Sequence, residues 1–319
     1  MLTKIKALVF GHAVADALGV PVEFKSRAEL AENPVSDVRG YGTYNMPPGS
    51  WSDDTSMTLA LMDSIARLQK IDYADIMQNF LRWLDESEFT PTGKLFDIGN
   101  ATREALYRYK KGRDPLECGG KSEYDNGNGS LMRISPMACW LYAKYGADIS
   151  APEMERVHNI SALTHRHPRS LIACGIYVEI AVLLLAGNKL KSAIEAGISA
   201  AFKIYAADAR FKSELAAYDR LQDIDSLSRL PIEQINSTGY VVDTLEAVIY
   251  CLLTTDNYKD CVLKAINLGD DTDTVGAITG GLSGLVYGIG DIPKKWQESL
   301  LKRDYIDELC VKFYQAITV

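Results

Sequence analysis

Hydrophobic residues recur along most of the chain with the spacing of about 3.6 residues that is typical of amphipathic helices. In residues 73–86, for example, Ile76, Phe80, Leu81 and Leu84 fall on one helical face. Alternating hydrophobic and polar runs bounded by turn residues, the signature of strands, do not stand out. The pattern therefore predicts an all-α protein, with helices that include residues 55–68, 73–86, 172–187, 190–205 and 241–255.

Turn-rich breaks interrupt this helical pattern at residues 40–50 and 118–130. Neither break resembles a Pro/Ser-rich linker, and the composition does not shift along the chain. We therefore expect a single domain over residues 1–319, with long loops available for function.

Small residues form a regular stripe in the apolar segment 274–290, which is short and glycine-rich for a membrane span. Each glycine in a helix costs roughly 0.5–1 kcal/mol relative to alanine, so close packing of another backbone must offset the stripe. The stripe consists of Gly276, Gly280, Gly284 and Gly288. Residues Gly11, Ala15 and Gly19 form a similar stripe near the start of the chain. The two helices are predicted to cross closely at the centre of the fold.

Composition and charge indicate which binding partners and which cellular compartment to expect. The chain has 319 residues, 47% of them hydrophobic, and a formal net charge of −8. A basic stripe is absent from the sequence, so general nucleic-acid binding is not expected, and neither is membrane binding. Six cysteines without a CxxC pair predict buried free thiols in a reducing compartment. The apolar core of the first segment, residues 7–10, is too short for a signal peptide, so we expect a cytoplasmic protein that begins with a helix.

Acidic residues stand at the starts of two apolar segments, "GSWSDDTSMTLAL" (49–61) and "NLGDDTDTVGAITGG" (267–281). Helix capping accounts for one acid at such a position, but not for several. Asp270, Asp271 and Asp273 repel one another and have no nearby Lys or Arg in the sequence. A hard divalent cation, which prefers carboxylate and hydroxyl oxygens, would relieve this repulsion.

Other metal and phosphate chemistries fit the sequence less well. An EF-hand loop that starts at Asp271 would need a glutamate where Leu282 stands. Residues 271–275 also match the DxDxT pattern of haloacid-dehalogenase-like phosphatases, an alternative that requires a preceding strand. Four histidines and scattered cysteines offer no cluster of zinc ligands.

Six motifs, in order, resemble the ADP-ribosylglycohydrolase family. They are "GHAVADALGVPVEF", "GSWSDDTSMTLAL", "NGNGSLMRISP", "ALTHRHPRS", "GYVVDTLEAV" and "GDDTDTVGAITGGLSG". The resemblance implies a compact orthogonal bundle of helices with two Mg²⁺ ions, for which Mn²⁺ can substitute. It implies hydrolysis at the anomeric carbon of an ADP-ribosyl group carried by a protein or a small molecule. A catalytically silent ADP-ribose-binding protein, as in the crystallin-like branch, is the alternative.

The resemblance also assigns metal-site and catalytic residues. It implies a catalytic set of Glu23, Asp54 and Asp273, with Glu23 beside the metals or the attacking water. Asp270 occupies a position where many relatives have glycine, and it is not expected to be a ligand. Ala15 replaces a family glycine, whereas the neighbouring Asp16 is kept. The metal ligands implied by the resemblance are Ser52, Asp53, Asp54, Asp271, Asp273 and Thr274.

A glycine-rich loop is expected to hold the diphosphate of ADP-ribose through its backbone N–H groups. Arg133 could bind phosphate or anchor this loop, His165 could border the substrate or fix a loop, and Tyr240 could line the cleft or the core. Arginine, serine, nucleobase and O-acetyl acceptors all stay open. The expected substrate-binding residues are Gly127, Asn128, Gly129, Ser130, Met132, His165, Gly239 and Tyr240.

Overall fold

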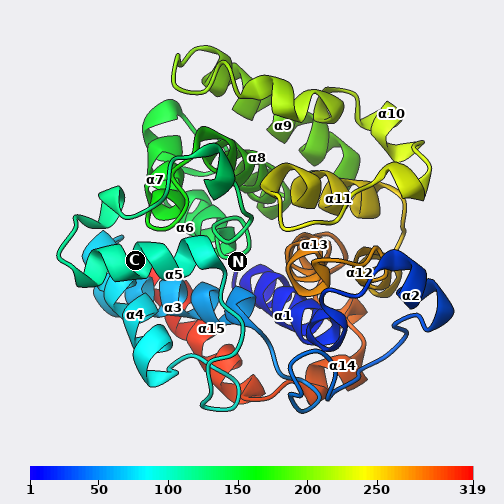
Figure 1. Ribbon diagram of the computed structural model, residues 1–319. Helices are drawn as coiled ribbons and strands as arrows, with labels where there is room; N and C mark the ends of the chain where they lie inside the picture. The colour runs from blue at the N-terminus through cyan, green and yellow to red at the C-terminus, as the bar shows by residue number, and fades with distance from the viewer. Residues whose placement is uncertain (319) are drawn as a thin grey trace.

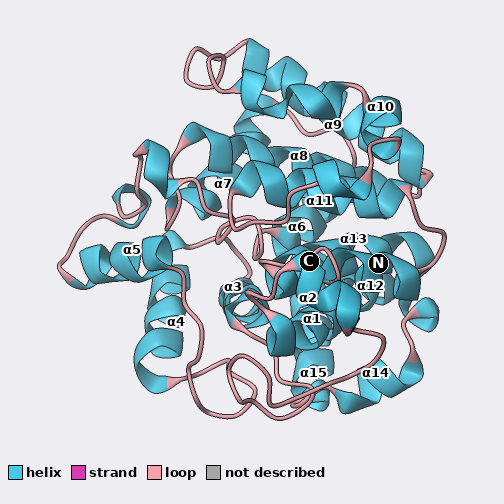
Figure 2. Cartoon of the chain, turned by 45° about the vertical axis from the view of Figure 1, so that its right-hand side comes forward, coloured by secondary structure: helices cyan, strands magenta, loops and turns pink. Residues whose placement is uncertain are grey.

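The computed structural model describes residues 1–318, which form α-helices and short 3₁₀ helices joined by loops, with no β-strand among them (Figures 1 and 2). The all-α prediction is therefore confirmed. The α-helices are α1 (Leu2–Gly19), α2 (Arg27–Glu32), α3 (Asp53–Leu68), α4 (Tyr73–Glu86), α5 (Asn100–Lys110), α6 (Ser135–Tyr145), α7 (Ala151–Ala162), α8 (Pro168–Leu185), α9 (Leu190–Ala206), α10 (Ile224–Ser228), α11 (Val241–Leu253), α12 (Tyr258–Ile266), α13 (Thr272–Tyr287), α14 (Lys294–Ser299) and α15 (Arg303–Thr318).

The predicted helices are present, with small differences at their ends. Helix α4 has the predicted bounds, and α3 begins directly after its N-cap, Ser52. Helix α8 begins four residues before the predicted start, at Pro168. Proline suits the first turn because it lacks an N–H group, and His167 caps the helix by accepting the N–H of Arg169 at 3.3 Å.

Helices α1 and α13 cross at the centre of the molecule, where both are largely buried (Figure 1). A side chain at Gly11 would collide with the carbonyl oxygen of Gly280, and one at Gly280 with that of Gly11. Gly284 faces the carbonyl oxygen of Ala7 in the same way. The predicted close crossing is confirmed, and it brings the carboxyl end of α1 beside the amino end of α13.

One member of the predicted glycine stripe lies outside the helix. Gly288 is the C-cap of α13, with a left-handed φ of 81°, and an added Cβ there would have no atom within 4 Å. Glycine is favoured at this position because it adopts positive φ without steric cost, not because another helix approaches.

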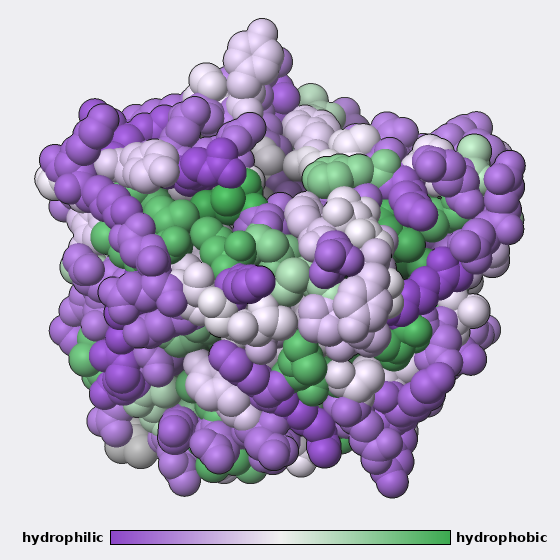
Figure 3. All heavy atoms as spheres, turned by 60° about the horizontal axis from the view of Figure 1, so that its bottom comes forward, coloured by the Kyte–Doolittle hydropathy of each residue, from purple (hydrophilic) through white to green (hydrophobic). Residues whose placement is uncertain are grey.

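The other helices cover this central pair. Helix α8 packs against α9, α6 and α7, while α3 packs against α15 and α4. Residues 2–22 and 168–185 are apolar and long enough to cross a membrane, yet both segments are mostly buried in the fold, as core helices are. On the face seen in Figure 3, hydrophilic side chains surround smaller hydrophobic areas. All six cysteines are free and buried, as expected.

Candidate active site

The two acidic segments, far apart in sequence, meet at the end of the α1–α13 crossing. Asp53 and Asp54 occupy the first turn of α3, while Asp271 and Asp273 lie at the start of α13. The Thr274 hydroxyl donates a hydrogen bond to Oδ2 of Asp54 at 3.1 Å, which joins the two segments directly. The hypothesis that they form halves of one site agrees with this contact.

Helix capping does not explain the acids on α3, because other groups cap this helix. Asp16 of α1 accepts hydrogen bonds from the Ser52 N–H at 2.9 Å, the Thr55 N–H at 3.1 Å and the Thr55 hydroxyl at 2.5 Å. Ser52 is the N-cap, and its hydroxyl lies 3.1 Å from Oδ2 of Asp54. The carboxylates of Asp53 and Asp54 are therefore free for another role.

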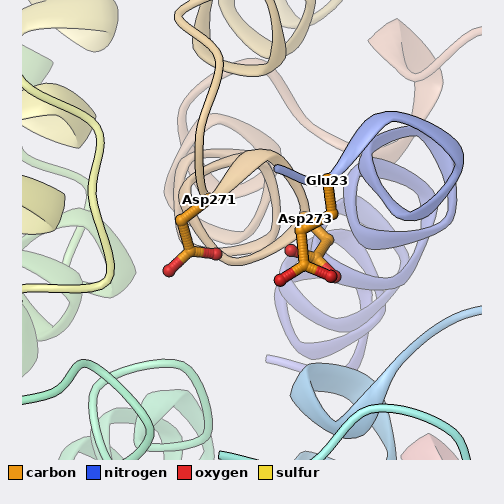
Figure 4. Close-up of side chains that lie close together, drawn as sticks. All are labelled: Glu23, Asp271 and Asp273. Carbon is orange, nitrogen blue, oxygen red and sulfur yellow. The ribbon is translucent and has the colours of Figure 1, made fainter. Parts of the chain in front are cut away.

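Glu23, Asp271 and Asp273 each offer one carboxylate oxygen such that the three atoms lie within 4.8 Å of one another. Figure 4 shows these carboxylates pointing to the same side, with Glu23 just beyond α1 and both aspartates at the start of α13. Ligand oxygens bind Mg²⁺ or Ca²⁺ at about 2.0–2.6 Å, so one cation can bridge atoms at this separation.

Three oxygens of this acid cluster are buried without a hydrogen-bond partner: Glu23 Oε2, Asp54 Oδ1 and Asp273 Oδ2. Buried carboxylates normally have a counter-charge or hydrogen bonds. Across residues 1–318, the ion pairs involve none of these three acids. The arrangement fits hard divalent cations.

Burial and mutual repulsion disfavour the charged forms of these acids. Burial, followed by the charge of Asp97, raises the pKa of Glu23 to about 9. The pKa values of Asp53, Asp54 and Asp273 are raised well above the ordinary aspartate value, first by burial and then by neighbouring carboxylates. A bound cation would reverse this effect, since it stabilises the ionised form.

Asp97 belongs to this cluster, although the sequence analysis did not identify it. Burial raises the pKa of Asp97, and so does the charge of Asp271. Hydrogen bonds with the Asp53 side chain and with the Tyr44 hydroxyl lower it. Asp97 has a left-handed φ of 54°, and it lies in the loop between α4 and α5, where no periodicity or neighbouring acid marks it. Only the folded chain brings it to the acids.

A cleft of about 420 Å³ opens over the acids and also contains the glycine-rich loop. Its lining includes Glu23, Asp53, Asp97 and Asp271, together with Gly127, Asn128, Gly129 and Met132. The Asn128 side-chain amide donates to Oδ2 of Asp271 at 2.7 Å, so the loop also orients one of the acids. The predicted binding loop and the predicted metal site thus share one cavity.

Arg133 anchors the glycine-rich loop from inside the core. Its side chain is fully buried, donates to the carbonyl oxygens of Gly129 and Ile160, and stacks 5.1 Å from the ring of Phe80. Because the Gly129 carbonyl points to Arg133, the Ser130 N–H across the same trans peptide points the opposite way. Of the two roles considered from the sequence, the geometry supports anchoring.

The other predicted binding residues divide between the cleft and the core. His165 lines the cleft, and burial followed by the charge of Arg133 lowers its pKa to about 3, which keeps the ring neutral. Gly239 also lines the cleft and accepts the Asn128 N–H at 3.1 Å. Two side chains instead meet protein groups: Ser130 accepts from Ser161 at 2.7 Å, and the Tyr240 hydroxyl accepts from Arg169 at 3.2 Å.

Of the remaining acids, Asp270 is exposed and lies outside the cluster, in agreement with the sequence analysis. Its φ of 58° explains why glycine suits this position. Its carbonyl oxygen accepts the Phe24 N–H at 2.7 Å, and its own N–H donates to the Lys25 carbonyl at 2.8 Å. These two bonds hold the segment that carries Glu23 against the start of α13.

Comparisons with known proteins agree with this site. The family model described as ADP-ribosylglycohydrolase matches residues 1–319. The ADP-ribosylarginine hydrolase Tri1 of Serratia proteamaculans is 31% identical over 316 residues, which cover 99% of this chain and 80% of the relative. The ADP-ribosyl-[dinitrogen reductase] glycohydrolase of Rhodospirillum rubrum is 32% identical over 292 residues, which cover 91% of this chain and 87% of the relative.

The fold has a solved counterpart as well. A structure titled ADP-ribosylglycohydrolase-related protein complex superposes with a TM-score of 0.81 and 28% identity, and the match covers 100% of this chain and 99% of that one. A family model that matches the whole chain, relatives that match nearly all of it, and a shared all-α fold lead to one conclusion: the protein belongs to the ADP-ribosylglycohydrolase family.

Proposed function

We propose that this protein is a divalent-metal-dependent hydrolase that releases ADP-ribose from the guanidinium group of ADP-ribosylated arginine. The observation that carries the proposal is a cluster of acids with buried, unpartnered carboxylate oxygens, whose members Glu23, Asp53 and Asp271 line the same cleft as the glycine-rich loop. Relatives named as acting on ADP-ribosylarginine and on ADP-ribosyl-dinitrogen reductase support the choice of reaction and acceptor. Six free, buried thiols support action in a reducing compartment such as the cytoplasm.

Two sets of residues in the cleft suit two parts of the substrate. The backbone N–H groups of Gly127, Gly129 and Ser130 would bind the diphosphate, since that of Asn128 is donated to the Gly239 carbonyl, and Arg133 fixes the orientation of the loop. The acids would hold Mg²⁺ or Mn²⁺, ions that bind ribose hydroxyls, polarise water and stabilise developing negative charge. Asp54, Asp271 and Asp273 would serve as ligands, and hydrogen bonds from Thr274 and Asn128 fix the orientation of Asp54 and Asp271.

Hydrolysis breaks the bond between the anomeric carbon and the guanidino nitrogen, and a water oxygen takes the place of that nitrogen. The bond breaks ahead of full water attack in an oxocarbenium-like transition state, which nearby carboxylates stabilise. Oε2 of Glu23 has no protein partner and lines the cleft, so it is placed to accept the proton of the attacking water. The proton that Glu23 accepts is passed, directly or through solvent, to the departing guanidino nitrogen, and the products are ADP-ribose and arginine.

The test is an assay of ADP-ribose release with Mg²⁺, with Mn²⁺ and with chelator. The substrates are ADP-ribosylarginine, ADP-ribosylserine and O-acetyl-ADP-ribose. We expect metal-dependent release that is fastest from ADP-ribosylarginine. Binding of ADP-ribose without release from any substrate would instead identify a silent binding protein, and faster release from the serine or acetyl conjugate would overturn the proposed acceptor.

A further inference from the structure

Three aromatic side chains from separate loops converge beside the acids. The Phe24 and Tyr44 rings lie 6.5 Å apart at 61°, and the Tyr44 and Phe96 rings lie 5.2 Å apart at 50°. Phe24 directly follows Glu23, and Phe96 directly precedes Asp97. We call Phe24, Tyr44, Phe96 and Asp97 the aromatic–acid rim.

The backbone holds part of this rim in unusual conformations. Phe24 and Asp97 both have positive φ values, 65° and 54°, which residues other than glycine rarely adopt. At residues 23 and 24 the consequence is a sharp change of direction: Glu23 is 6% exposed, whereas Phe24 is 70% exposed and lines the cleft. The Phe24 N–H bond to Asp270 and a bond from the Thr43 hydroxyl to the Glu23 carbonyl, at 2.8 Å, hold this turn. Strain of this kind is concentrated at functional sites.

The composition of the rim suits a planar cation. Aromatic faces attract guanidinium groups, and carboxylates bind them through charge-assisted hydrogen bonds. Beside the rim, Oε2 of Glu23 is buried and unpartnered. The cation–π contacts that occur within residues 1–318 leave the rings of Phe24, Tyr44 and Phe96 unused, so the protein itself does not fill the rim with a Lys or Arg.

The rim lies in the cleft beside the acids, where the acceptor would be held. In an ADP-ribosyl conjugate the diphosphate, the distal ribose and the acceptor follow one another in a line. With the diphosphate at the Gly127–Ser130 loop and the ribose at the acids, the acceptor lies beyond the acids. Phe24 and Asp97 line the same cleft as the acids and directly neighbour them, since Phe24 follows Glu23 in the chain and Asp97 hydrogen-bonds Asp53.

We propose that the aromatic–acid rim is the specificity site for the acceptor, where it binds the guanidinium group of arginine and discriminates against neutral acceptors. This inference rests on the proposed function and adds the residues that select the substrate. Phe24 stacks on the guanidinium, Tyr44, itself packed against Phe96, supports the Phe24 ring, and Asp97 supplies the counter-charge.

The test compares Phe24→Leu with the wild-type protein, both loaded with Mg²⁺. Phe24 is exposed, so leucine keeps an apolar side chain there and removes only the aromatic face. For this variant we expect kcat/KM to fall about 5- to 20-fold for ADP-ribosylarginine and to change less than about 2-fold for O-acetyl-ADP-ribose. Tyr107→Leu is the control, because Tyr107 is an exposed aromatic residue on α5 outside the cleft. Equal losses on both substrates would overturn the inference.

A second measurement does not depend on turnover. Calorimetry on the protein with Mg²⁺ and ADP-ribose would compare arginine with citrulline, whose neutral urea has the shape of a guanidinium group. The wild-type protein should bind arginine at least about 5-fold more tightly, and Phe24→Leu should lose that preference. Absence of hydrolysis with every conjugate would refute the proposed function. The calorimetric comparison of arginine with citrulline would then still test whether the rim binds a guanidinium group. No preference for arginine in the wild-type protein would refute the rim.

Discussion

At the scale of single residues, aspartates in and around the site have different structural roles. Asp16 caps α3 from the neighbouring helix, Asp270 makes a left-handed turn, and Asp273 leaves one carboxylate oxygen buried and unpartnered. Their contacts distinguish them, whereas their residue type does not. This difference allows a matched pair of substitutions.

Asp273→Asn should lower kcat roughly 100-fold or more while the fold is kept, because the change preserves size and removes the charge of a proposed metal ligand. Steady-state kinetics at saturating Mg²⁺, with circular dichroism as a check of the fold, measures this. Asp270→Asn is the control: Asp270 is exposed, asparagine tolerates left-handed φ, and activity should stay at the wild-type level. Equal activity of the two variants would remove Asp273 from the ligand set.

Arg133→Lys should weaken ADP-ribose binding about 10-fold, which corresponds to about 1.4 kcal/mol. Lysine keeps the charge but cannot reach both the Gly129 and Ile160 carbonyls with a rigid fork, so the glycine-rich loop loses its orientation. KM should rise more than kcat falls. Arg156→Lys, an exposed change on α7, should leave both constants unchanged. An unaltered KM with a lower melting temperature would restrict Arg133 to a stabilising role.

The acids could be predicted from sequence because clustered charges without counter-ions have few explanations. Asp97 could not, since one aspartate in a loop has no local pattern, and only tertiary structure brings it to Asp53. The sequence also could not distinguish a loop residue that faces the cleft from one that faces the core. Ser130 and Gly129 are neighbours, yet Gly129 lines the cleft while the Ser130 side chain is buried against Ser161.

At the scale of elements, the crossing of α1 and α13 positions the site. The glycine spacing predicted this contact because four glycines in one helix need a steric reason, and three of them face α1. Helix ends were predicted less accurately. Some capping groups come from other helices, as Asp16 of α1 does for α3. Helix α13 ends at Tyr287, because Gly288 follows it as a C-cap with a left-handed φ.

Gly280→Ala should destabilise the protein by roughly 1–3 kcal/mol or more, because the new methyl group would meet the Gly11 carbonyl oxygen and force the helices apart. Chemical denaturation measures the loss. Gly290→Ala provides the comparison, since a Cβ there has no atom within 4 Å and φ is not left-handed. If Gly280→Ala proved as stable as Gly290→Ala, the crossing would be looser than described.

At the scale of the whole molecule, metal binding and pH should be linked. Without metal, burial raises the pKa of Glu23 to about 9 and that of Asp16 to about 7, so the folded protein holds protons that the unfolded chain releases near pH 4. The metal-free protein therefore loses stability as pH rises from about 4 towards 9. Cations that replace these protons bind more tightly at higher pH.

The increase in melting temperature on replacing EDTA with Mg²⁺ should accordingly be larger at pH 8.5 than at pH 7. Titration of buried histidines does not affect stability in this pH range. Burial lowers the pKa of His12 to about 4, for example, so His12 destabilises the fold only below about pH 6.5, where the histidine of the unfolded chain takes up a proton. Differential scanning calorimetry at the two pH values gives the comparison. An increase that is the same at both, or larger at pH 7, would contradict the metal assignment.

The hydrogen bond between Thr274 and Asp54 spans 220 residues of sequence, and this separation has a consequence in time. At about 5–20 residues per second, a ribosome needs roughly 10–45 s to proceed from one half of the site to the other. Throughout that interval α1 lacks the partner that buries its stripe of small residues, and Asp54 lacks the residues of α13 that would complete the proposed cation site. Activity and metal affinity should therefore arise late and together during synthesis, after α13 has emerged, and shorter nascent chains should depend on chaperones to protect α1.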